Sequence, residues 1–432
     1  MKDLHDIASR ARKAFYSISV SSSDQRNAVL TSLVRILDEN REKVFAANRI
    51  DIAEAEESGL ASPLLHRLNF GEEKMCQMIR GLQALAGLPD PINKTLVSTE
   101  IADSLDLYRV SCPIGVVGVI FESRPDALIQ ISSLCIKSGN AVLLKGGHEA
   151  AHTNRILCEL VRMALEEVSM PADVAQLLET REDVARMLKE DTLIDLIIPR
   201  GSNSFVRYIM DNSRIPVLGH SDGICHVYVD KNADMETALK VALDSKIQNV
   251  SVCNAMETLL VHRDIAARFL PEAARLFAEA NVELRGDNDC AGVIACKPAT
   301  DSDWSTEYLD YILSIRIVSS LQEAIEHINR YGSHHTDCIV TEDSAAASVF
   351  LNTVDSAGVY LNVSTRFADG FVYGLGAEVG IATGKLHARG PMGLEGLTTY
   401  KYKLIGHGHT MQAVKSGEIK YTHKSLNMNC PI

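Results

Sequence analysis

The sequence lacks long apolar runs, closely spaced cysteine pairs and an excess of positive charge. Its longest apolar run, from Ile114 to Phe121, contains two glycines and is far shorter than the roughly 20 residues that cross a bilayer. Acidic residues number 56 against 43 basic ones, which gives a net charge of −13. A field of that sign repels phosphate backbones and anionic lipid. We therefore expect no nucleic acid and no membrane as partners, and any anionic ligand must be held by a few local Arg or Lys residues.

Two further absences concern the compartment. The ten cysteines are scattered over 432 residues without a CxxC pair, which favours reduced thiols over a disulfide framework. The first 15 residues carry charge throughout and lack the apolar block of a signal peptide. We expect a cytoplasmic globular protein with enough chain for two or three packed domains.

The first 90 residues have the pattern of helices. Ser22 and Gln25 have capping-box spacing, and apolar residues from Val29 to Leu37 then repeat at helical intervals. The alternation from Thr95 to Val110 predicts an extended arm or hairpin. The polar tail from Thr410 predicts loose order.

From Gly115 onward strands and helices alternate. The apolar runs predict strands at 116–121, 141–145, 174–178 and 193–198, each followed by a helix. This order favours right-handed crossovers and a doubly wound parallel sheet. A second alternation begins near Cys225 and continues to about Leu397. The sequence therefore predicts two α/β lobes and an extended arm.

A glycine fingerprint of the form GxGxxG, which marks many dinucleotide-binding sheets, is absent after the first of these strands. An alternative device is Lys145 with Gly146 and Gly147 at the carboxyl end of a strand, where ligands sit in open α/β sheets. A solvated lysine before a turn explains the same residues. The turn Arg200-Gly201-Ser202 precedes a helix whose N-terminus suits a pyrophosphate, but such turns are common.

Cys253 is the strongest nucleophile candidate. It lies in a stretch of small and polar residues, 249–255, where backbone N–H groups can stabilise a thiolate, and a modest fall in its pKa would raise the reactive fraction. A structural role explains it about equally well on this evidence. The pairs His334-His335 and His407/His409 lack a second pair at ligand spacing, so we interpret them as loop histidines and expect no metal site.

Long motifs carry a family resemblance. These are GVVGVI from Gly115, FESRPDALIQ from Phe121, SGNAVLLKGGHEAAHTN from Ser138, VCNAMETLLVH from Val252, TRFADGF from Thr365, GLGAEVGI from Gly374 and GKLHARGPMGLEGLTTYKY from Gly384. Together they resemble the aldehyde dehydrogenase superfamily over nearly the whole chain.

The resemblance implies the fold and its division. It implies an α/β fold with a Rossmann-type parallel-sheet cofactor domain (1–94 and 114–227) and an α/β catalytic domain (228–397). A small β oligomerisation arm and the C-terminal tail would form the rest (95–113 and 398–432). It further implies a homo-oligomer, dimer or tetramer, in which the arm packs against a partner subunit.

The most specific motifs resemble the branch of the superfamily that reduces L-glutamyl 5-phosphate to L-glutamate 5-semialdehyde with NADPH and releases phosphate, in proline synthesis. In that branch Cys253 would attack the acyl carbon and form a thioester. The resemblance also implies a functional link to glutamate 5-kinase.

The resemblance assigns site residues. Those implied to bind substrate are Ser123, Arg124, Asn254, Ser364, Thr365 and Arg366. Those implied to bind the cofactor NADPH/NADP are Lys145, Gly146, Gly147, Arg200, Gly201, Ser202 and Glu307.

Two departures qualify the resemblance. Hydrolytic members carry a Glu that activates water, whereas the matching segment here, Pro216 to His220, has no carboxylate, which favours reduction of an acyl phosphate. The branch commonly has Pro where Val250 stands, which leaves the geometry of the loop open. The alternatives are a related phosphate- or thioester-linked aldehyde dehydrogenase with another acyl substrate, and a catalytically silent scaffold.

Overall fold

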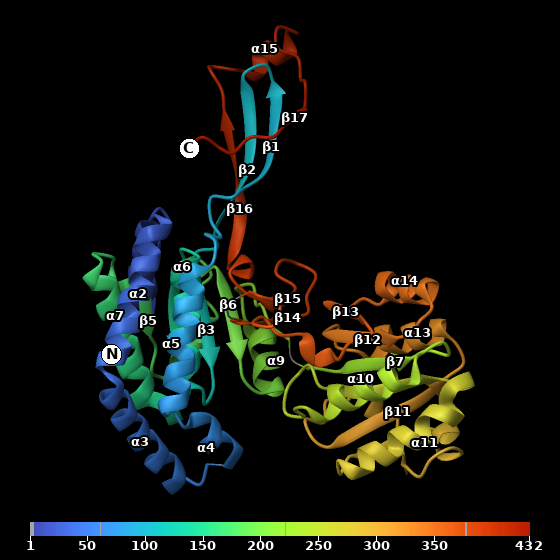
Figure 1. The fold of residues 1–432 in the computed structure, drawn as a ribbon. Helices are drawn as coiled ribbons and strands as arrows, with labels where there is room; N and C mark the ends of the chain where they lie inside the picture. The colour runs from blue at the N-terminus through green and yellow to red at the C-terminus, as the bar shows by residue number, and fades with distance from the viewer. Residues whose placement is uncertain (1–3, 61, 221, 376–377) are drawn as a thin grey trace.

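The computed structural model describes residues 4–60, 62–220, 222–375 and 378–432. Two α/β bodies lie side by side, and a long β arm rises from the first of them (Figure 1). Within the described ranges, no helix is both long enough and apolar enough to cross a membrane. Of the motif at 374–381, residues 376–377 lie outside the described residues.

The first body is built on a four-stranded parallel sheet with the order β5-β4-β3-β6. Its strands are β3 (Val116–Phe121), β4 (Ala141–Lys145), β5 (Ala175–Leu177) and β6 (Leu196–Arg200). Its helices are α1 (Leu4–Ile18), α2 (Ser23–Glu39), α3 (Arg41–Glu57), α4 (Ser62–Leu68), α5 (Glu72–Gly87), α6 (Pro125–Lys137), α7 (Ala151–Glu167), α8 (Arg181–Met187) and α9 (Asn203–Asn212).

Helices cover both faces of this sheet. Val117 and Val119 of β3 pack into one apolar cluster with α2, α5, α6 and α7, whereas Val116 and Ile120 pack into a second cluster with α1. A strand that is buried on both faces needs apolar residues at every position, and the sequence of β3 is therefore a continuous apolar run. The capping box that the sequence predicts at Ser22 is present, and Thr180 forms a second one at the start of α8.

The second body contains a seven-stranded parallel sheet with the order β10-β9-β11-β8-β7-β12-β13. Its strands are β7 (Cys225–Val229), β8 (Met256–His262), β9 (Glu283–Gly286), β10 (Lys297–Pro298), β11 (Ile312–Val318), β12 (Thr336–Val340) and β13 (Gly358–Leu361). Its helices are α10 (Met235–Ile247), α11 (Arg263–Glu279), α12 (Asn288–Ala291), α13 (Leu321–Tyr331) and α14 (Ser344–Thr353). The aldehyde dehydrogenase-like α/β fold expected from the sequence is confirmed by these two parallel sheets and the separate antiparallel arm.

The arm is an antiparallel sheet with the order β16-β2-β1-β17. Its strands are β1 (Thr95–Ala102), β2 (Leu105–Pro113), β16 (Thr398–Ile405) and β17 (Lys424–Leu426), with a short helix α15 (Met411–Lys415) at the tip. The prediction of a loosely ordered tail after Thr410 is wrong, because β17 pairs with β1 and the backbone of Cys430 bonds to Thr95. The tail is polar since it covers a sheet edge in solvent rather than a core.

Two boundaries differ from the sequence-based expectation. The strand expected at 193–198 is β6 at 196–200, because residues 193–195 still close the turn after α8. Residues 379–397, expected in the catalytic domain, return to the first body. There β14 (Gly380–Ala382) pairs with β15 (Gly390–Met392), and Val379, Met392 and Leu397 join the first body's apolar core.

Candidate active site

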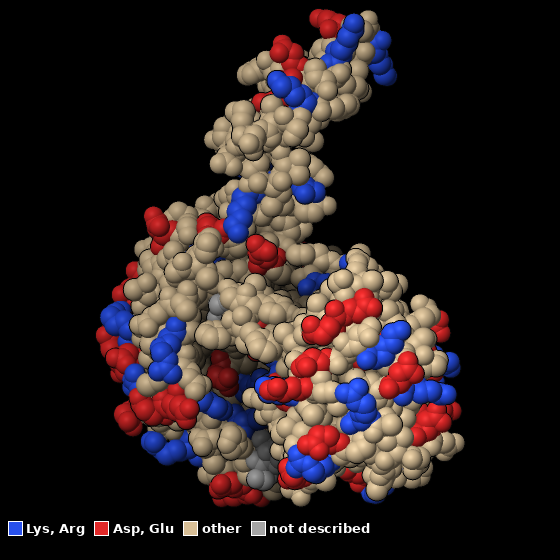
Figure 2. Space-filling view, turned by 45° about the vertical axis from the view of Figure 1, so that its right-hand side comes forward, with Lys and Arg blue, Asp and Glu red and all other residues tan. Residues whose placement is uncertain are grey.

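The candidate site lies where the two sheets face each other. Phe121 and Arg200 end strands of the first sheet, whereas Cys225, Cys253 and His335 begin or precede the neighbouring strands β7, β8 and β12 of the second. Carboxyl ends of one parallel sheet therefore meet amino ends of the other. Figure 2 shows the surface hollowed between the two bodies, with charged side chains of both signs along the hollow.

Cys253 sits on the segment 249–255 between α10 and β8, called the nucleophile loop below. The Asn249 side chain accepts a hydrogen bond from the Ser251 N–H at 3.0 Å, an Asx turn that fixes the loop where Val250 replaces the expected proline. A Cβ on Gly223 would lie 2.2 Å from the Cys253 carbonyl oxygen, so only glycine permits this approach. The Cys225 thiol also donates to that carbonyl at 3.3 Å.

The Cys253 sulfur faces two imidazoles that sequence reasoning did not select. His335 Nε2 lies 3.2 Å from Cys253 Sγ, and His335 is 1% exposed. The His220 ring meets the His335 ring edge-on with centroids 5.0 Å apart. His335 lies in the loop before β12, as expected, but it is buried against the nucleophile, a contact that the sequence interpretation missed.

Burial keeps all three groups neutral. It raises the pKa of the Cys253 thiol to about 12, with Arg200 acting weakly in the opposite direction. It lowers the pKa of His220 and holds the pKa of His335 well below its ordinary value. The fall in the thiol pKa that would raise the reactive fraction is therefore not found, because desolvation outweighs the nearby cations. The resting pair is a thiol and a neutral imidazole.

Two arginines approach the nucleophile. Arg200 lies 3.7 Å from Glu378, and Arg366 donates from Nε to the Gln248 side chain at 2.8 Å. Burial lowers the pKa of each guanidinium, and each interacts electrostatically with Cys253. The sequence grouped Arg200 with the cofactor, whereas the structure places it beside Cys253 as well.

Three residues expected to bind substrate have side chains engaged within the chain. Thr365 donates from its hydroxyl to the Asn254 carbonyl at 2.7 Å, and Asn254 donates from Nδ2 to the Ala368 carbonyl at 3.0 Å. The Ser364 hydroxyl accepts the Arg366 N–H at 3.2 Å. These contacts tie the loop that carries Arg366 to the nucleophile loop, so the three residues position the site.

Ser123 and Arg124 follow β3 at the edge of the hollow. Ser123 is buried with φ +44°, and its N–H and hydroxyl both donate to Glu149 Oε1 at 2.7 Å. The next residue, Arg124, is the exposed N-cap of α6 and interacts electrostatically with Arg200 and Glu378. The positive φ of Ser123 turns the chain between β3 and α6, and Arg124 follows this turn directly.

A small cavity lies beyond the carboxyl ends of β4 and β5. It is lined by Gly146, Gly147, His148, Ala151, Asn154, Leu177, Leu178 and Glu179. Cβ atoms on Gly146 and Gly147 would lie 2.2 Å from the Asn154 side chain and 2.0 Å from the Glu149 carboxylate. Asn154 Oδ1 is buried without a hydrogen-bond partner, and Lys145 donates to the Gly146 carbonyl. An orphaned acceptor in a glycine-lined cavity fits a polar ligand such as a nucleotide.

The other expected cofactor residues lie nearer the second body. The Glu122 carboxylate accepts the Ser202 N–H at 3.0 Å and lies 2.5 Å from a Cβ built on Gly201, so it already occupies part of the α9 N-terminus. Glu307 accepts from Asn203 Nδ2 of α9 at 2.5 Å and from the Gly223 N–H. Glu307 thereby links α9 to the segment packed against Cys253.

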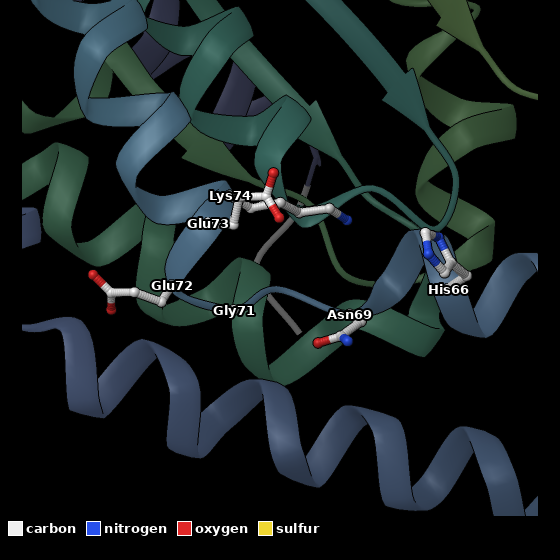
Figure 3. Close-up of a pocket in the computed structure, with 6 residues that line it drawn as sticks. All are labelled: His66, Asn69, Gly71, Glu72, Glu73 and Lys74. Atoms are coloured by element: carbon white, nitrogen blue, oxygen red, sulfur yellow. The ribbon is translucent and has the colours of Figure 1, made fainter.

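A further cavity lies between α4 and α5, lined by His66, Asn69, Gly71, Glu72, Glu73 and Lys74. Lys74 donates to the Arg67 carbonyl at 2.8 Å. Figure 3 shows that Glu72 and Lys74 point in opposite directions. Because its polar groups do not converge, this cavity lacks the feature that ligand sites share.

Comparisons with known proteins agree with this geometry. Residues 1–301 match the model of the aldehyde dehydrogenase family, whose members use nicotinamide cofactors.

Named relatives are more specific. The chain is 53% identical to gamma-glutamyl phosphate reductase of Acetivibrio thermocellus over 99% of this chain and 100% of the relative. It is 54% identical to the enzyme of that name from Pelotomaculum thermopropionicum over 98% of both chains. The crystal structure of gamma-glutamyl phosphate reductase from Thermotoga maritima superimposes with a TM-score of 0.93 at 38% identity, covering 95% of this chain and 100% of that one. The chain therefore belongs to the aldehyde dehydrogenase family and, within it, to the gamma-glutamyl phosphate reductases.

Proposed function

We propose that the protein reduces L-glutamyl 5-phosphate to L-glutamate 5-semialdehyde and releases phosphate, a step in proline biosynthesis. The names of its relatives support the substrate. The observation that carries the proposal is the Cys253 thiol paired at 3.2 Å with His335 between the two bodies. A second imidazole, His220, faces this thiol from the segment where hydrolytic members carry a carboxylate.

The first step transfers the acyl group to sulfur. As Cys253 Sγ attacks the acyl carbon, its proton moves to His335 Nε2, and the bond between that carbon and the phosphate oxygen breaks. The proton on His335 can then pass to the departing phosphate. Because the resting pair is neutral, charge separates only when the anionic substrate is present to stabilise the imidazolium.

The second step reduces the thioester. A bound NADPH supplies the hydride for this step. Lys145, Gly146, Gly147 and the unpaired Asn154 Oδ1 would hold its nucleotide part, and Glu307 would reach it from the second body. When the aldehyde leaves, Cys253 is released as a thiolate. It regains a proton that His335 takes up from solvent, because the first proton has left with the phosphate.

Arginines supply the charge that the net field of −13 does not. We assign Arg366, Arg124 and Arg200 to the phosphate and α-carboxylate of the substrate. Arg200 and Arg366 each interact electrostatically with Cys253, and Arg124 interacts with Arg200. A guanidinium grips either anion with two parallel hydrogen bonds. Ser123, Asn254, Ser364 and Thr365 position these arginines.

The domain roles follow from this assignment. The first body would bind NADPH, residues 228–378 would form the catalytic body, and the arm would pack against another subunit of a homo-oligomer. The arm exposes Tyr400, Tyr402 and Leu404 along β16, and Figure 2 shows few charged side chains in the middle of its shaft. Ten free thiols support a cytoplasmic location. A functional link to glutamate 5-kinase would supply the unstable acyl phosphate.

The test is phosphate-dependent reduction of NADP⁺ by L-glutamate 5-semialdehyde, run beside NAD⁺ and a panel of neutral aldehydes. We expect strict dependence on phosphate, preference for NADP⁺ and for the semialdehyde, and no turnover by Cys253→Ser. Faster turnover of a neutral aldehyde would favour the related dehydrogenase with another acyl substrate. Turnover of neither the semialdehyde nor a neutral aldehyde would favour a silent scaffold.

A further inference from the structure

The described residues include one group of side chains whose donor atoms suit a soft metal ion. The ligand atoms of His220, Cys253 and His335 all lie within 4.8 Å of one another. They come from three separate segments, the loop before Gly223, the nucleophile loop and the residue before β12. One thiol and two imidazoles form a donor set that prefers Zn²⁺ to Mg²⁺ or Ca²⁺.

The two imidazoles are oriented by their other nitrogens. His220 Nδ1 lies 3.0 Å from the Ile381 carbonyl oxygen, which can only accept, so Nδ1 carries the proton and Nε2 keeps its lone pair. His335 Nδ1 lies 2.9 Å from the Thr336 hydroxyl, while its Nε2 lies 3.2 Å from Cys253 Sγ. Metal-binding histidines are held through the second nitrogen in this way.

The spacing is close to that of a tetrahedral site. With Zn–S near 2.3 Å and Zn–N near 2.0 Å, ligand atoms in such a site lie about 3.3 to 3.6 Å apart. The Cys253–His335 pair, at 3.2 Å, is slightly closer than this separation and must open a little, whereas the widest pair must close from at most 4.8 Å.

The surrounding charge is mixed. Arg200 and Arg366 oppose a cation at this point, whereas Glu307 and Glu378 favour one. Loss of the thiol proton on coordination adds a further negative charge at the sulfur.

We propose that His220, Cys253 and His335 form a three-ligand site for Zn²⁺ that closes the nucleophile reversibly, with the fourth position open to water or to an anion. The sulfur lone pair that would attack the acyl carbon is then bonded to the metal, so turnover stops until the metal leaves. Metal binding is independent of the proposed function, and only the effect on turnover rests on it.

The test uses Co²⁺ as a spectroscopic probe on the full-length, metal-free protein. We expect one equivalent of Co²⁺ to give a sulfur-to-metal charge-transfer band and tetrahedral visible bands that Zn²⁺ displaces and Mg²⁺ does not. Cys253→Ser should lose the charge-transfer band, and His220→Gln and His335→Gln should each weaken binding about tenfold or more. His334→Asn is the matched control, because His334 bonds to the Asp355 carbonyl and asparagine tolerates its φ of +60°.

Labelling gives a second readout that does not depend on turnover. Zn²⁺ should protect Cys253 from iodoacetamide, and EDTA should restore the labelling. A charge-transfer band that survives in Cys253→Ser, equal binding by His220→Gln and wild type, or full labelling of Cys253 in saturating Zn²⁺ would each overturn the site. An inactive enzyme with intact Co²⁺ bands would refute the proposed function alone.

Discussion

Replacing His335 by glutamine tests the thiol–imidazole pair most directly. The substitution removes the group 3.2 Å from the sulfur and keeps a polar side chain of similar reach. Because burial raises the pKa of the Cys253 thiol to about 12, almost none of it is ionised at pH 7.5, so the nucleophile needs a local proton acceptor. A positioned base contributes about 10²- to 10⁴-fold. We expect kcat at pH 7.5 to fall by that factor.

The pH dependence separates this role from simple packing. In the wild type, the His335 pKa lies well below its ordinary value, so the base is neutral at pH 7 and activity falls only at acid pH, where His335 gains a proton. In His335→Gln the reaction depends on free thiolate, so its rate should rise about tenfold per pH unit below the thiol pKa of about 12. The deficit against wild type therefore shrinks as the pH rises.

The assay is steady-state turnover from pH 6 to 10 together with the rate of iodoacetamide labelling of Cys253 over the same range. Nucleotide affinity and the melting temperature serve as controls, and His334→Asn is the matched variant. A loss below about threefold at pH 7.5, or a deficit of constant size across the range, would refute the proton-acceptor role.

Three further substitutions, the first with a matched control, test other contacts in the two bodies. Gly223→Ala should lower kcat by at least about tenfold while nucleotide binding survives, since its Cβ would lie 2.2 Å from a backbone oxygen of the nucleophile loop. Its control is Gly81→Ala. A Cβ at Gly81 meets nothing within 4 Å, so this variant should stabilise α5 by about 0.5–1 kcal/mol in urea unfolding. Lys246→Met leaves the fully buried Glu257 without its partner at 2.6 Å and should lower the free energy of unfolding by about 3–5 kcal/mol. Lys240→Met, which breaks the exposed pair with Glu236, is the control. An equally large destabilisation by Lys240→Met would contradict the effect of burial. Arg200→Gln should raise KM for the acyl phosphate about tenfold or more and slow iodoacetamide labelling, because it removes the cation that lowers the thiol pKa; an unchanged KM would exclude phosphate contact.

Local pattern predicts the strands of this fold well because both faces of each sheet are buried. The runs at 116–121 and 141–145 coincide with β3 and β4 at every residue. The strand at 193–198 is displaced because Leu193 and Ile194 are apolar for another reason, which is to cap the core beneath α8. The prediction of a loosely ordered tail after Thr410 was wrong, because a strand that covers a sheet edge in solvent needs no apolar pattern.

The sequence likewise predicts some residues of the candidate site and misses others. Cys253 is predictable from its loop and from the resemblance, whereas His220 and His335 are not, because they are near Cys253 only through the strand order β8-β7-β12. The sequence pattern predicts that Cys253 and His335 each precede a strand of a parallel sheet. It does not predict the order of the strands in that sheet, and this order is what brings the two residues together. The roles of Ser364 and Thr365 were also hidden, since a hydroxyl that holds a loop and one that holds a ligand have the same sequence.

The neutral resting state of the pair has a consequence for when the enzyme is reactive. A pre-formed thiolate would sit exposed to oxidants and metals in the absence of substrate, whereas burial that raises the thiol pKa to about 12 keeps the sulfur protonated until an acceptor takes the proton. The imidazolium that forms on His335 is costly in the same buried setting, so it needs a nearby anion. An acyl phosphate brings that anion and the electrophile in one molecule. Because burial disfavours ionisation, the thiol becomes a nucleophile only when the substrate is bound. A soft divalent ion can also displace the thiol proton, so it can bind the sulfur in place of the substrate without any reaction following.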